Sequence, residues 1–524
     1  MHAMSTRAPA PDDDACYLAL KAHDARFDGS FFTGVTSTGI YCRPVCKVRT
    51  PRRENCRFFT LAAQAEQAGF RPCLRCRPEL APGANTWSTQ DASGMLTRQA
   101  ARLLDDPAGW PDAAPAMTAL AARLGVSDRH LRRIFEAQLG VSPLQYLQTR
   151  RLLTAKQLLT DTDLPVTRVA LASGFASLRR FNAAFAAHYG LNPTRLRREG
   201  RTREGAGVAV QLGYRPPYDI AAMLGFFARR CIDGQEFVTG EAEDAVLGRT
   251  LRLQAGARNH TGWLTIRFDP ARQSVLLRVS DSLCEVLPLV ISRVRALLDL
   301  DADPAVINAG LSSSPIAQHG AFALDARLAG LRVPGCLDGF ELAVRAILGQ
   351  QITVAAARTL GQRLVARFGE PLATPWPGLS RLFPTAQALA QASGDALGQL
   401  GIVRQRQAAI VALAQATAQG QLTLDGNADV TATLAALKAL PGIGDWTAQY
   451  IAMRALRWPD AFPAGDVALQ KALGVASERE AERASQVWRP WRSYAVVRAW
   501  HQGATPPAGN TTQSIANNVH NTLD

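Results

Sequence analysis

The stretch Leu437-Lys-Ala-Leu-Pro-Gly-Ile-Gly-Asp-Trp-Thr-Ala-Gln-Tyr450 places a Pro-Gly-Ile-Gly turn between two segments with the spacing of α-helices. Because Gly442 and Gly444 have no side chain, the turn can approach a phosphate closely while the next helix presents free N–H groups to it. This pattern predicts a helix-hairpin-helix element, which binds DNA without reading its bases. An ordinary glycine-capped turn between two helices would show the same pattern, so the residues that follow must distinguish the two interpretations.

The second informative stretch is Phe462-Pro-Ala-Gly-Asp-Val-Ala-Leu-Gln-Lys471, which sets Asp466 after a Gly/Pro loop, twenty residues beyond Trp446. An aspartate in such a loop often caps a helix. The hairpin followed at this spacing by the loop and its aspartate resembles the helix-hairpin-helix DNA glycosylase superfamily, and the resemblance implies that Asp466 is catalytic. A carboxylate there would stabilise positive charge on the sugar as the N-glycosidic bond breaks, and would help to orient the attacking water.

Lysine usage bears on the mechanism. Of the 58 basic residues only five are lysines. Bifunctional members of the resembled superfamily place a Schiff-base lysine just after the hairpin, whereas this chain has Trp446 there. The resemblance therefore implies a monofunctional glycosylase that leaves an abasic site without cutting the strand.

Further upstream, Tyr214-Arg-Pro-Pro-Tyr-Asp219 is followed by Met223-Leu-Gly-Phe-Phe-Ala228. This order resembles the start of the AlkA family of 3-methyladenine DNA glycosylases, whose first domain is a small α/β layer. Two stretches with high strand propensity, Trp263-Leu-Thr-Ile-Arg-Phe268 and Ser274-Val-Leu-Leu-Arg-Val279, fit such a layer.

The AlkA resemblance also implies a pocket for a flipped purine, in which aromatic rings stack on a cationic alkylated base. Core packing would equally explain any single one of these rings. Two positions depart from the family: His501 stands where a tyrosine is usual, and Gln351, in Leu348-Gly-Gln-Gln-Ile-Thr353, replaces the apolar wedge that fills the gap left by the base. The predicted pocket residues are Trp446, Tyr450, Trp500, His501 and Gln351.

The N-terminal part contains two short-spaced cysteine pairs, Cys42-x3-Cys46 and Cys73-x2-Cys76. This spacing suits one tetrahedral Zn²⁺ held by four thiolates, and metal ligation would stabilise a block too small to bury much core. On spacing alone an inert zinc knuckle is the ordinary interpretation. Cys16 and Cys56 have no short-spaced partner, so we expect them to be apolar fillers.

Three neighbouring motifs make the cysteine block more specific. They are Thr38-Gly-Ile-Tyr-Cys-Arg-Pro-Val-Cys46, Arg53-Glu-Asn-Cys-Arg-Phe-Phe59 and Ala68-Gly-Phe-Arg-Pro-Cys-Leu-Arg-Cys-Arg-Pro78. They resemble the N-terminal domain of the Ada family of alkylation-response proteins, in which zinc binds four cysteine thiolates and the first of them accepts methyl from a DNA methylphosphotriester. The resemblance implies that Cys42 is the nucleophile and that methylation lowers the negative charge of the cluster, which would strengthen DNA binding.

Residues 95–198 predict a helical block with two helix-turn-helix units. Met117–Phe135 gives a short helix, a Gly125 turn, a Ser127 N-cap and a basic second helix, and Val166–Phe185 repeats the order. The second unit resembles AraC-type regulators. A solvated basic face would explain the arginines too, but the doubled motif favours recognition helices in the major groove. The predicted DNA-contacting residues are Arg129, His130, Arg132, Arg133, Ser177, Arg179 and Arg180, together with Gly442, Ile443 and Gly444 of the hairpin.

The composition agrees with a DNA-binding protein. The net charge is +14, and residues 1–200 carry 27 basic and 17 acidic side chains, a net +10. Such an excess indicates a polyanionic partner. With 47% apolar and 19% charged residues, the chain is not disordered as a whole. No stretch of roughly 18 residues lacks charge, so we expect no membrane span. Nine cysteines and no apolar leader predict a reducing, cytoplasmic location near the bacterial nucleoid.

Together these patterns predict a multidomain α+β protein: a four-cysteine zinc domain, an all-α AraC-type double helix-turn-helix, and an α/β layer joined to an all-α glycosylase domain. We expect a DNA-3-methyladenine glycosylase combined with a methylphosphotriester-sensing transcriptional regulator. The alternative is a glycosylase whose N-terminal half only anchors it to DNA. The expected cofactors are one Zn²⁺ and a monovalent cation at the hairpin, and the expected partners are double-stranded DNA and RNA polymerase, without a membrane. The predicted domains are residues 1–82, 93–200, 207–303 and 304–503, followed by a disordered tail at 504–524.

Overall fold

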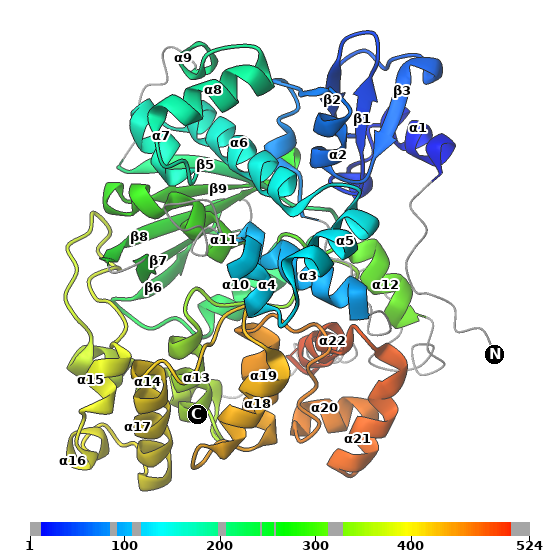
Figure 1. Cartoon of the computed structure of the whole chain (residues 1–524). Helices are drawn as coiled ribbons and strands as arrows, with labels where there is room; N and C mark the ends of the chain where they lie inside the picture. The colour runs from blue at the N-terminus through cyan, green and yellow to red at the C-terminus, as the bar shows by residue number, and fades with distance from the viewer. Residues whose placement is uncertain are drawn as a thin grey trace, which may run out of the picture.

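The computed structural model describes residues 12–83, 92–106, 117–197, 206–241, 244–255, 258–312 and 328–504. The tail predicted to be disordered falls, from residue 505 onward, outside the described residues, as does the linker segment 84–91. Figure 1 shows the whole chain coloured from its N-terminus to its C-terminus. None of the described helices is both long and apolar enough to cross a bilayer.

The cysteine module, residues 12–83, is built on a four-stranded sheet with the order β3-β1-β2-β4. Strand β1 pairs antiparallel with β2 and β3, while β2 runs parallel to β4 with Tyr41 opposite Pro72. Because these two strands are parallel neighbours, Cys42, the last residue of β2, and Cys73, which follows β4, lie at the same end of the sheet. The elements are α1 (Asp13–Lys21), β1 (Phe32–Val35), β2 (Ile40–Cys42), β3 (Cys56–Phe59), α2 (Ala62–Gln67) and β4 (Arg71–Pro72).

The next block contains the two predicted helix-turn-helix units, joined by the 19-residue helix α6. The second helix of each unit begins with a serine cap: Ser127 accepts from the His130 N–H and Ser177 from the Arg180 N–H, both at 3.2 Å. Each ends at a glycine, Gly140 or Gly190, with φ +68. The elements are α3 (Ala92–Asp105), α4 (Met117–Arg123), α5 (Asp128–Leu139), α6 (Pro143–Asp161), α7 (Val166–Ala172), α8 (Leu178–Tyr189) and α9 (Pro193–Leu196).

The α/β layer contains an antiparallel five-stranded sheet with the order β5-β9-β8-β7-β6. The two predicted strands lie in β8 and β9, which pair with each other, so this part of the sequence prediction is confirmed. The elements are β5 (Val208–Gly213), α10 (Ile220–Ala228), β6 (Glu236–Thr239), β7 (Val246–Ala255), β8 (Arg258–Asp269), β9 (Ser274–Val279) and α11 (Leu287–Leu297).

The C-terminal domain is helical and has two hydrophobic clusters, and Tyr450 packs against both. The predicted hairpin joins α18 to α19, and Asp466 immediately precedes α20. The candidate site therefore lies at the seam between the clusters. The helices are α12 (Pro304–Ser312), α13 (Gly339–Leu348), α14 (Val354–Phe368), α15 (Ala386–Ala390), α16 (Gly394–Gly398), α17 (Arg404–Ala418), α18 (Val430–Ala439), α19 (Asp445–Arg454), α20 (Val467–Leu473), α21 (Glu478–Ser485) and α22 (Arg492–Ala504).

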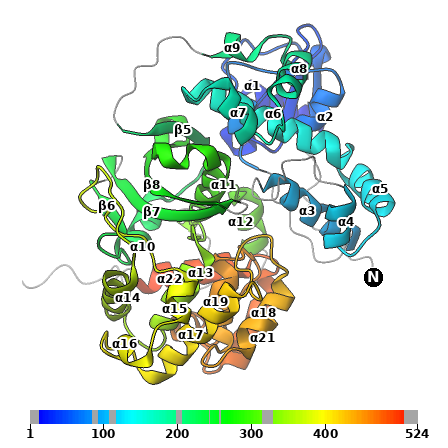
Figure 2. The same ribbon diagram turned by 60° about the vertical axis from the view of Figure 1, so that its left-hand side comes forward.

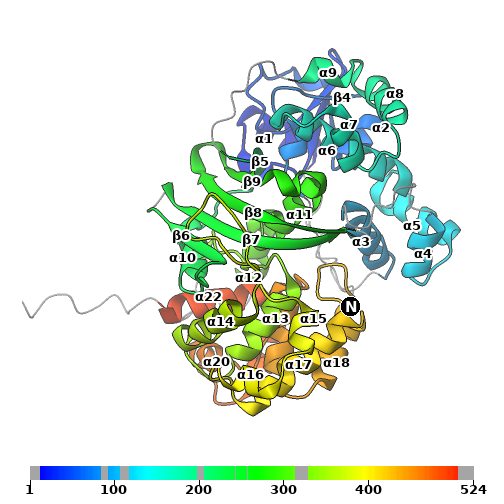
Figure 3. The same ribbon diagram turned by 90° about the vertical axis from the view of Figure 1, so that its left-hand side faces the viewer.

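The helix-turn-helix block and the α/β layer share one hydrophobic core. Leu158 and Phe181 from the former and Leu264 and Leu277 from the latter are fully buried in the same cluster. In all views the C-terminal helices lie on one side of the sheet, while α6–α9 and the cysteine module lie on the other (Figures 1, 2 and 3). The fold class predicted from the sequence, a multidomain α+β protein, is confirmed.

Candidate functional sites

Four cysteine sulfurs meet at the end of β2 and β4. The Sγ atoms of Cys42, Cys46, Cys73 and Cys76 all lie within 4.8 Å of one another. Four thiolates around zinc at about 2.3 Å would be about 3.8 Å apart, so a tetrahedral ion fits the cluster. The described cysteines form no disulfide, which leaves these four sulfurs available as ligands.

The thiols of the cluster cannot all ionise easily without a cation. Hydrogen bonds among the four thiols shift their pKa values in opposite directions. They raise the pKa of Cys42 above that of free cysteine, and they lower the pKa values of Cys46 and Cys73 below it. A divalent cation would remove the repulsion between four thiolates. The donor set and its spacing therefore fit a metal site of four cysteines, of the kind that binds Zn²⁺.

Backbone N–H groups reach the sulfurs of three cluster cysteines. Cys76 Sγ accepts from the Arg43 N–H at 3.4 Å, and backbone hydrogen bonds also reach Cys46, from Val48, and Cys73, from Cys76. The main influences on the Cys42 thiol are the other three thiols and burial. Exposure does not favour Cys42 as a nucleophile, because Cys42 is only 6% exposed and Cys76 is the least buried of the four.

Residues that sequence analysis missed hold the cluster against helix α6. Lys156, on α6 and 1% exposed, donates to Cys73 O at 3.0 Å and to Glu79 Oε2 at 2.6 Å. Arg77 bridges Glu79 at 3.0 Å and Asp161 at 2.6 Å. Lysine scarcity was the only sequence signal that singled out Lys156, and it did not indicate a contact with residues more than 70 positions away.

The predicted recognition helices present most of their candidate residues to solvent. Arg129, Arg132 and Arg133 on α5 are exposed and His130 is half-buried beside Arg133. Arg132 pairs with Asp128 at 3.0 Å on the same helix face. In the second unit, Ser177, Arg179 and Arg180 are exposed at the start of α8. The two sets start equivalent helices, as a paired helix-turn-helix requires.

The hairpin between α18 and α19 has one residue in the left-handed region, Gly442, with φ +74. A Cβ there would lie 3.1 Å from the Ala409 Cβ, so glycine also allows close packing against α17. A Cβ on Gly444, by contrast, would meet nothing within 4 Å, so this side of the turn is open to a ligand. Ile443 is 4% exposed, and its N–H donates to Leu440 O at 3.3 Å. Ile443 therefore anchors the turn, while Gly444 is exposed where α19 begins.

Asp466 is held by two hydrogen bonds. Its Oδ1 accepts from the Leu469 N–H at 2.9 Å, which makes it the N-cap of α20, and its Oδ2 accepts from the Trp446 indole N–H at 3.0 Å. The two roles suggested by the sequence, helix cap and site carboxylate, are therefore compatible. Trp446 and Asp466 come from different helices, and this bond fixes their relative position.

Three of the predicted pocket rings lie together. Trp446 and Tyr450 are stacked with ring centroids 5.3 Å apart, and Trp500 on α22 lies 6.0 Å from Tyr450. His501 follows Trp500 on the same helix and is half-buried, whereas Gln351 lies outside the stack, exposed on the loop between α13 and α14.

A buried arginine that sequence analysis missed supports the ring stack from behind. Arg454, 6% exposed, donates to the Tyr450 hydroxyl and to Pro334 O at 2.7 Å. Burial alone would raise the pKa of the Tyr450 phenol, but Arg454 and Arg230 more than offset this and hold the pKa below its ordinary value. The i, i+4 spacing of Tyr450 and Arg454 on one helix is the only sequence signal for this contact.

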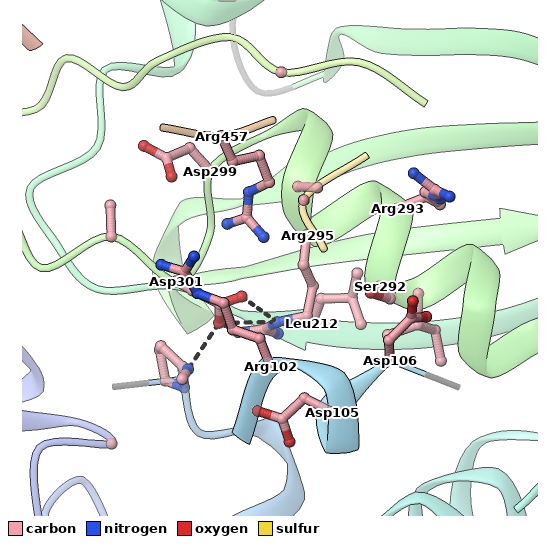
Figure 4. Close-up of a pocket in the computed structure, with 18 of the residues that line it drawn as sticks. Arg102, Asp105, Asp106, Leu212, Ser292, Arg293, Arg295, Asp299, Asp301 and Arg457 are labelled. Atoms are coloured by element: carbon pink, nitrogen blue, oxygen red, sulfur yellow. Dashed lines mark hydrogen bonds and ion pairs between the residues drawn. The ribbon is translucent and has the colours of Figure 1, made fainter. Parts of the chain in front are cut away.

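A cavity of about 350 Å³ lies where the four modules meet, and Asp466 is not among its lining residues. Figure 4 shows Arg102 and Arg457 reaching toward the ion pair of Arg295 with Asp301. Asp301 Oδ1 also accepts from the Gly83 N–H at 2.7 Å. The cavity is therefore a polar junction between the N-terminal half and the rest of the chain, separate from the ring stack.

These features define a helix-hairpin-helix DNA repair domain preceded by a four-cysteine metal domain and a double helix-turn-helix. Family comparison agrees along the chain. The descriptions of the matching families are "Metal binding domain of Ada" for residues 15–79, "Helix-turn-helix domain" for 120–199, "AlkA N-terminal domain" for 209–338 and "HhH-GPD superfamily base excision DNA repair protein" for 344–490.

One similar protein spans nearly the whole chain. The "Probable bifunctional transcriptional activator/DNA repair enzyme AlkA" of Mycobacterium tuberculosis is 38% identical over 93% of this chain and 96% of its own length. The chain therefore belongs to this family of bifunctional activator and repair proteins.

Two further relatives match one half each. "DNA-3-methyladenine glycosylase 2" of Escherichia coli is 34% identical over 56% of this chain and 98% of its own length. "Bifunctional transcriptional activator/DNA repair enzyme Ada" of Escherichia coli is 35% identical over 32% of this chain, a match that spans 44% of that relative. The resemblances to the Ada and AlkA families that the sequence motifs indicated are thus confirmed.

Proposed function

We propose that the C-terminal domain excises alkylated purines such as 3-methyladenine from double-stranded DNA, as a monofunctional glycosylase. The observation that carries this proposal is the carboxylate of Asp466 fixed by Trp446 beside a stack of aromatic rings. The names of the relatives that match this half support the substrate class.

In the proposed reaction the alkylated base leaves the helix and stacks on the rings of Trp446, Tyr450 and Trp500. The N-glycosidic bond then breaks, its electron pair goes to the base, and positive charge develops on the sugar beside Asp466. Water adds to the sugar C1′ and loses a proton, for which the Asp466 carboxylate is the nearest base. Trp446 and not a lysine stands just after the hairpin, so no Schiff base forms and the strand stays intact.

Hairpin contacts would place the lesion against this site. The outward N–H groups at Gly444 and the start of α19 would bind a phosphate of the damaged strand. A monovalent cation bound by hairpin carbonyls would add positive charge at the same place. These contacts do not depend on base identity, so selection among lesions would occur in the pocket. His501 and Gln351 are the two predicted pocket residues besides the three stacked rings.

Asp466→Asn tests the catalytic assignment, and Asp429→Asn is a matched control. Both aspartates cap a helix, Asp429 by accepting from the Ala432 N–H at 2.7 Å, and asparagine caps equally well. On alkylated duplex DNA we expect Asp466→Asn to release methyladenine at least a hundredfold more slowly, and Asp429→Asn to match the native protein. Equal rates for all three proteins would refute the role of Asp466.

We also propose that Cys42 accepts methyl from a DNA methylphosphotriester. The Cys42 sulfur attacks the methyl carbon, the S–C bond forms as the C–O bond breaks, and the phosphodiester anion leaves with the bonding pair. Zinc, when bound, keeps the four thiols ionised. The resemblance to Ada supports Cys42, whose sulfur lies within 4.8 Å of the other three.

Peptide mapping tests this second activity without altering the cluster. After incubation with DNA carrying isotope-labelled methylphosphotriesters, we expect label on the peptide with Cys42 and none on Cys46, Cys73 or Cys76. Label on Cys76, which is the most exposed of the four, would refute the assignment of Cys42 and show that accessibility selects the nucleophile.

The N-terminal half would then be a sensor that binds promoter DNA at the nucleoid and contacts RNA polymerase. Methylation of one thiolate makes the cluster one unit less negative, which favours DNA. A reporter assay after alkylation stress distinguishes this proposal from a passive anchor. A regulator gives induction that Arg179→Ala and Arg180→Ala abolish, whereas an anchor gives no induction although excision continues.

A further inference from the structure

The loop between α13 and α14 is attached to the hairpin through one side chain. Gln350 Nε2 donates to Gly442 O at 2.9 Å and to Thr447 Oγ1 at 3.0 Å. The backbone carbonyl of Gln350 in turn accepts from the Arg406 guanidinium on α17. Gln350 therefore joins three segments that lie far apart in the sequence: its own loop, the hairpin with α19, and the start of α17.

The first bond locks a peptide group of the hairpin. Gly442 O and the Ile443 N–H belong to the same peptide unit: the oxygen accepts from Gln350, and the N–H donates to Leu440 O. With both ends bonded this unit cannot rotate, and the next N–H groups, at Gly444 and Asp445, keep their direction. The second bond reaches Thr447, the residue after Trp446, so it also ties the loop to the helix that carries the ring stack.

The next residue of the loop, Gln351, has a constrained backbone. It is exposed and has φ +53, in the left-handed region that residues other than glycine rarely adopt. Residues on both sides maintain this conformation. Gln350 precedes Gln351, and Thr353, which follows it, caps α14 by accepting from the Ala356 N–H at 3.2 Å. A strained, exposed residue held on both sides is typical of a functional position.

We propose that Gln350 is a positioning residue that couples phosphate binding at the hairpin to insertion of Gln351 into the base stack. The inference rests on the proposed glycosylase function and on Gln351 as the gap-filling residue. Gln350 itself does not touch the lesion. It holds the loop at a fixed offset from the hairpin, so that when the hairpin binds the backbone, Gln351 lies opposite the gap. Gln351 then prevents the flipped base from returning to the helix, and the base stays against the stacked rings.

This role predicts which property a substitution changes. Gln350→Met keeps the length of the side chain but removes both donors, so the loop and the hairpin can move independently. Duplex binding by the hairpin amides should persist, while the fraction of flipped base should fall. A residue with a merely structural role would lower thermal stability and affinity together.

The flipping step can be measured separately from excision in an Asp466→Asn background. The probe is duplex DNA with 2-aminopurine next to 1,N6-ethenoadenine, whose fluorescence increases when stacking is lost. We expect Gln350→Met to reduce the amplitude about tenfold and to leave the affinity for undamaged duplex within about threefold of the parent. Gln415→Ala, at an exposed site on α17, is the control and should change neither.

Gln351→Ala completes the set, because it removes the inserted side chain but keeps the Gln350 bonds. We expect it to lower the amplitude like Gln350→Met, and the double variant to be no worse than either single one. Additive losses would mean that the two residues act independently and would overturn the coupling, as would an unchanged amplitude in Gln350→Met. Absence of excision by the native protein, with normal flipping, would instead refute the proposed function and leave the coupling intact.

Discussion

The indole N–H of Trp446 donates to the carboxylate of Asp466 at 3.0 Å, across two helices that are joined by a long Gly/Pro loop. The same ring stacks on Tyr450. One tryptophan therefore fixes the carboxylate and forms a wall of the proposed base pocket.

Trp446→Phe separates these two roles, because phenylalanine keeps a ring but has no N–H to donate. A hydrogen bond to a charged group contributes about 1.5–3 kcal/mol, so we expect kcat to fall roughly tenfold to a hundredfold. KM should change little, since stacking persists. Single-turnover release of methyladenine measures this effect, and a change in KM alone would show that the indole only binds the base.

Tyr450 should ionise before the buried tyrosines of the protein. Arg454 and Arg230 lower its pKa below 10.0 despite burial, whereas burial raises the pKa of Tyr214 to about 12. As the pH rises, the phenolate of Tyr450 should therefore form earlier than that of Tyr214. Phenolate absorbance during alkaline titration measures this order.

Two variants assign the early transition in that titration. Tyr450→Phe should remove it, and Arg454→Met should move it to higher pH because the nearest cation is gone. An early transition that persists in Tyr450→Phe would assign the low pKa to another tyrosine.

Removal of Lys156 should destabilise the N-terminal half. Lys156→Met leaves the buried Glu79 without its closest partner, which typically costs about 3–5 kcal/mol, with Arg77 reducing that loss. The double change Lys156→Met with Glu79→Gln should recover part of it. Urea denaturation measures both, and a double variant less stable than the single one would contradict this account.

The same pair predicts an acid sensitivity. Burial would raise the pKa of Glu79, but Lys156 and Arg77 lower it below its ordinary value of 4.5. A carboxyl with a lowered folded-state pKa stabilises the protein above the unfolded value, and the stabilisation is lost as the pH falls from about 4.5 through the folded value. Unfolding curves from pH 7 to pH 3 should converge for the native protein and the double variant.

Exposed arginines on α8 should contribute to promoter binding and not to excision. Arg179→Ala and Arg180→Ala each remove one candidate phosphate or base contact. For a phosphate contact, the slope of log affinity against log salt should fall by about 0.9. Arg272→Ala, in the turn between β8 and β9 and also exposed, is the control and should leave the slope unchanged. Excision rates should stay within about twofold for all three.

Much of the site could be predicted because its chemistry lies in local motifs. Two cysteine pairs, a Pro-Gly-Ile-Gly turn and an aspartate after a Gly/Pro loop are each readable over a few residues, because ligand spacing and turn conformation are local properties of the chain. The stacking of Trp446 on Tyr450 also follows from i, i+4 spacing on one helix. The role of Cys42 is implied by resemblance, and the meeting of its sulfur with the other three became visible only in the folded cluster.

The amino-acid sequence by itself thus determined the modules, their order and the residue types available for chemistry. Only the tertiary structure decided that Lys156 contacts Cys73 O, that Arg454 lies behind Tyr450 with Arg230 nearby, and that Gln350 joins a loop to the hairpin. It also decided that α6–α8 share a core with the five-stranded sheet. Apart from Tyr450 and Arg454, one helical turn apart, these relationships join residues many positions apart. Burial of apolar surface brings them together, and such long-range packing leaves no periodic signal in the chain.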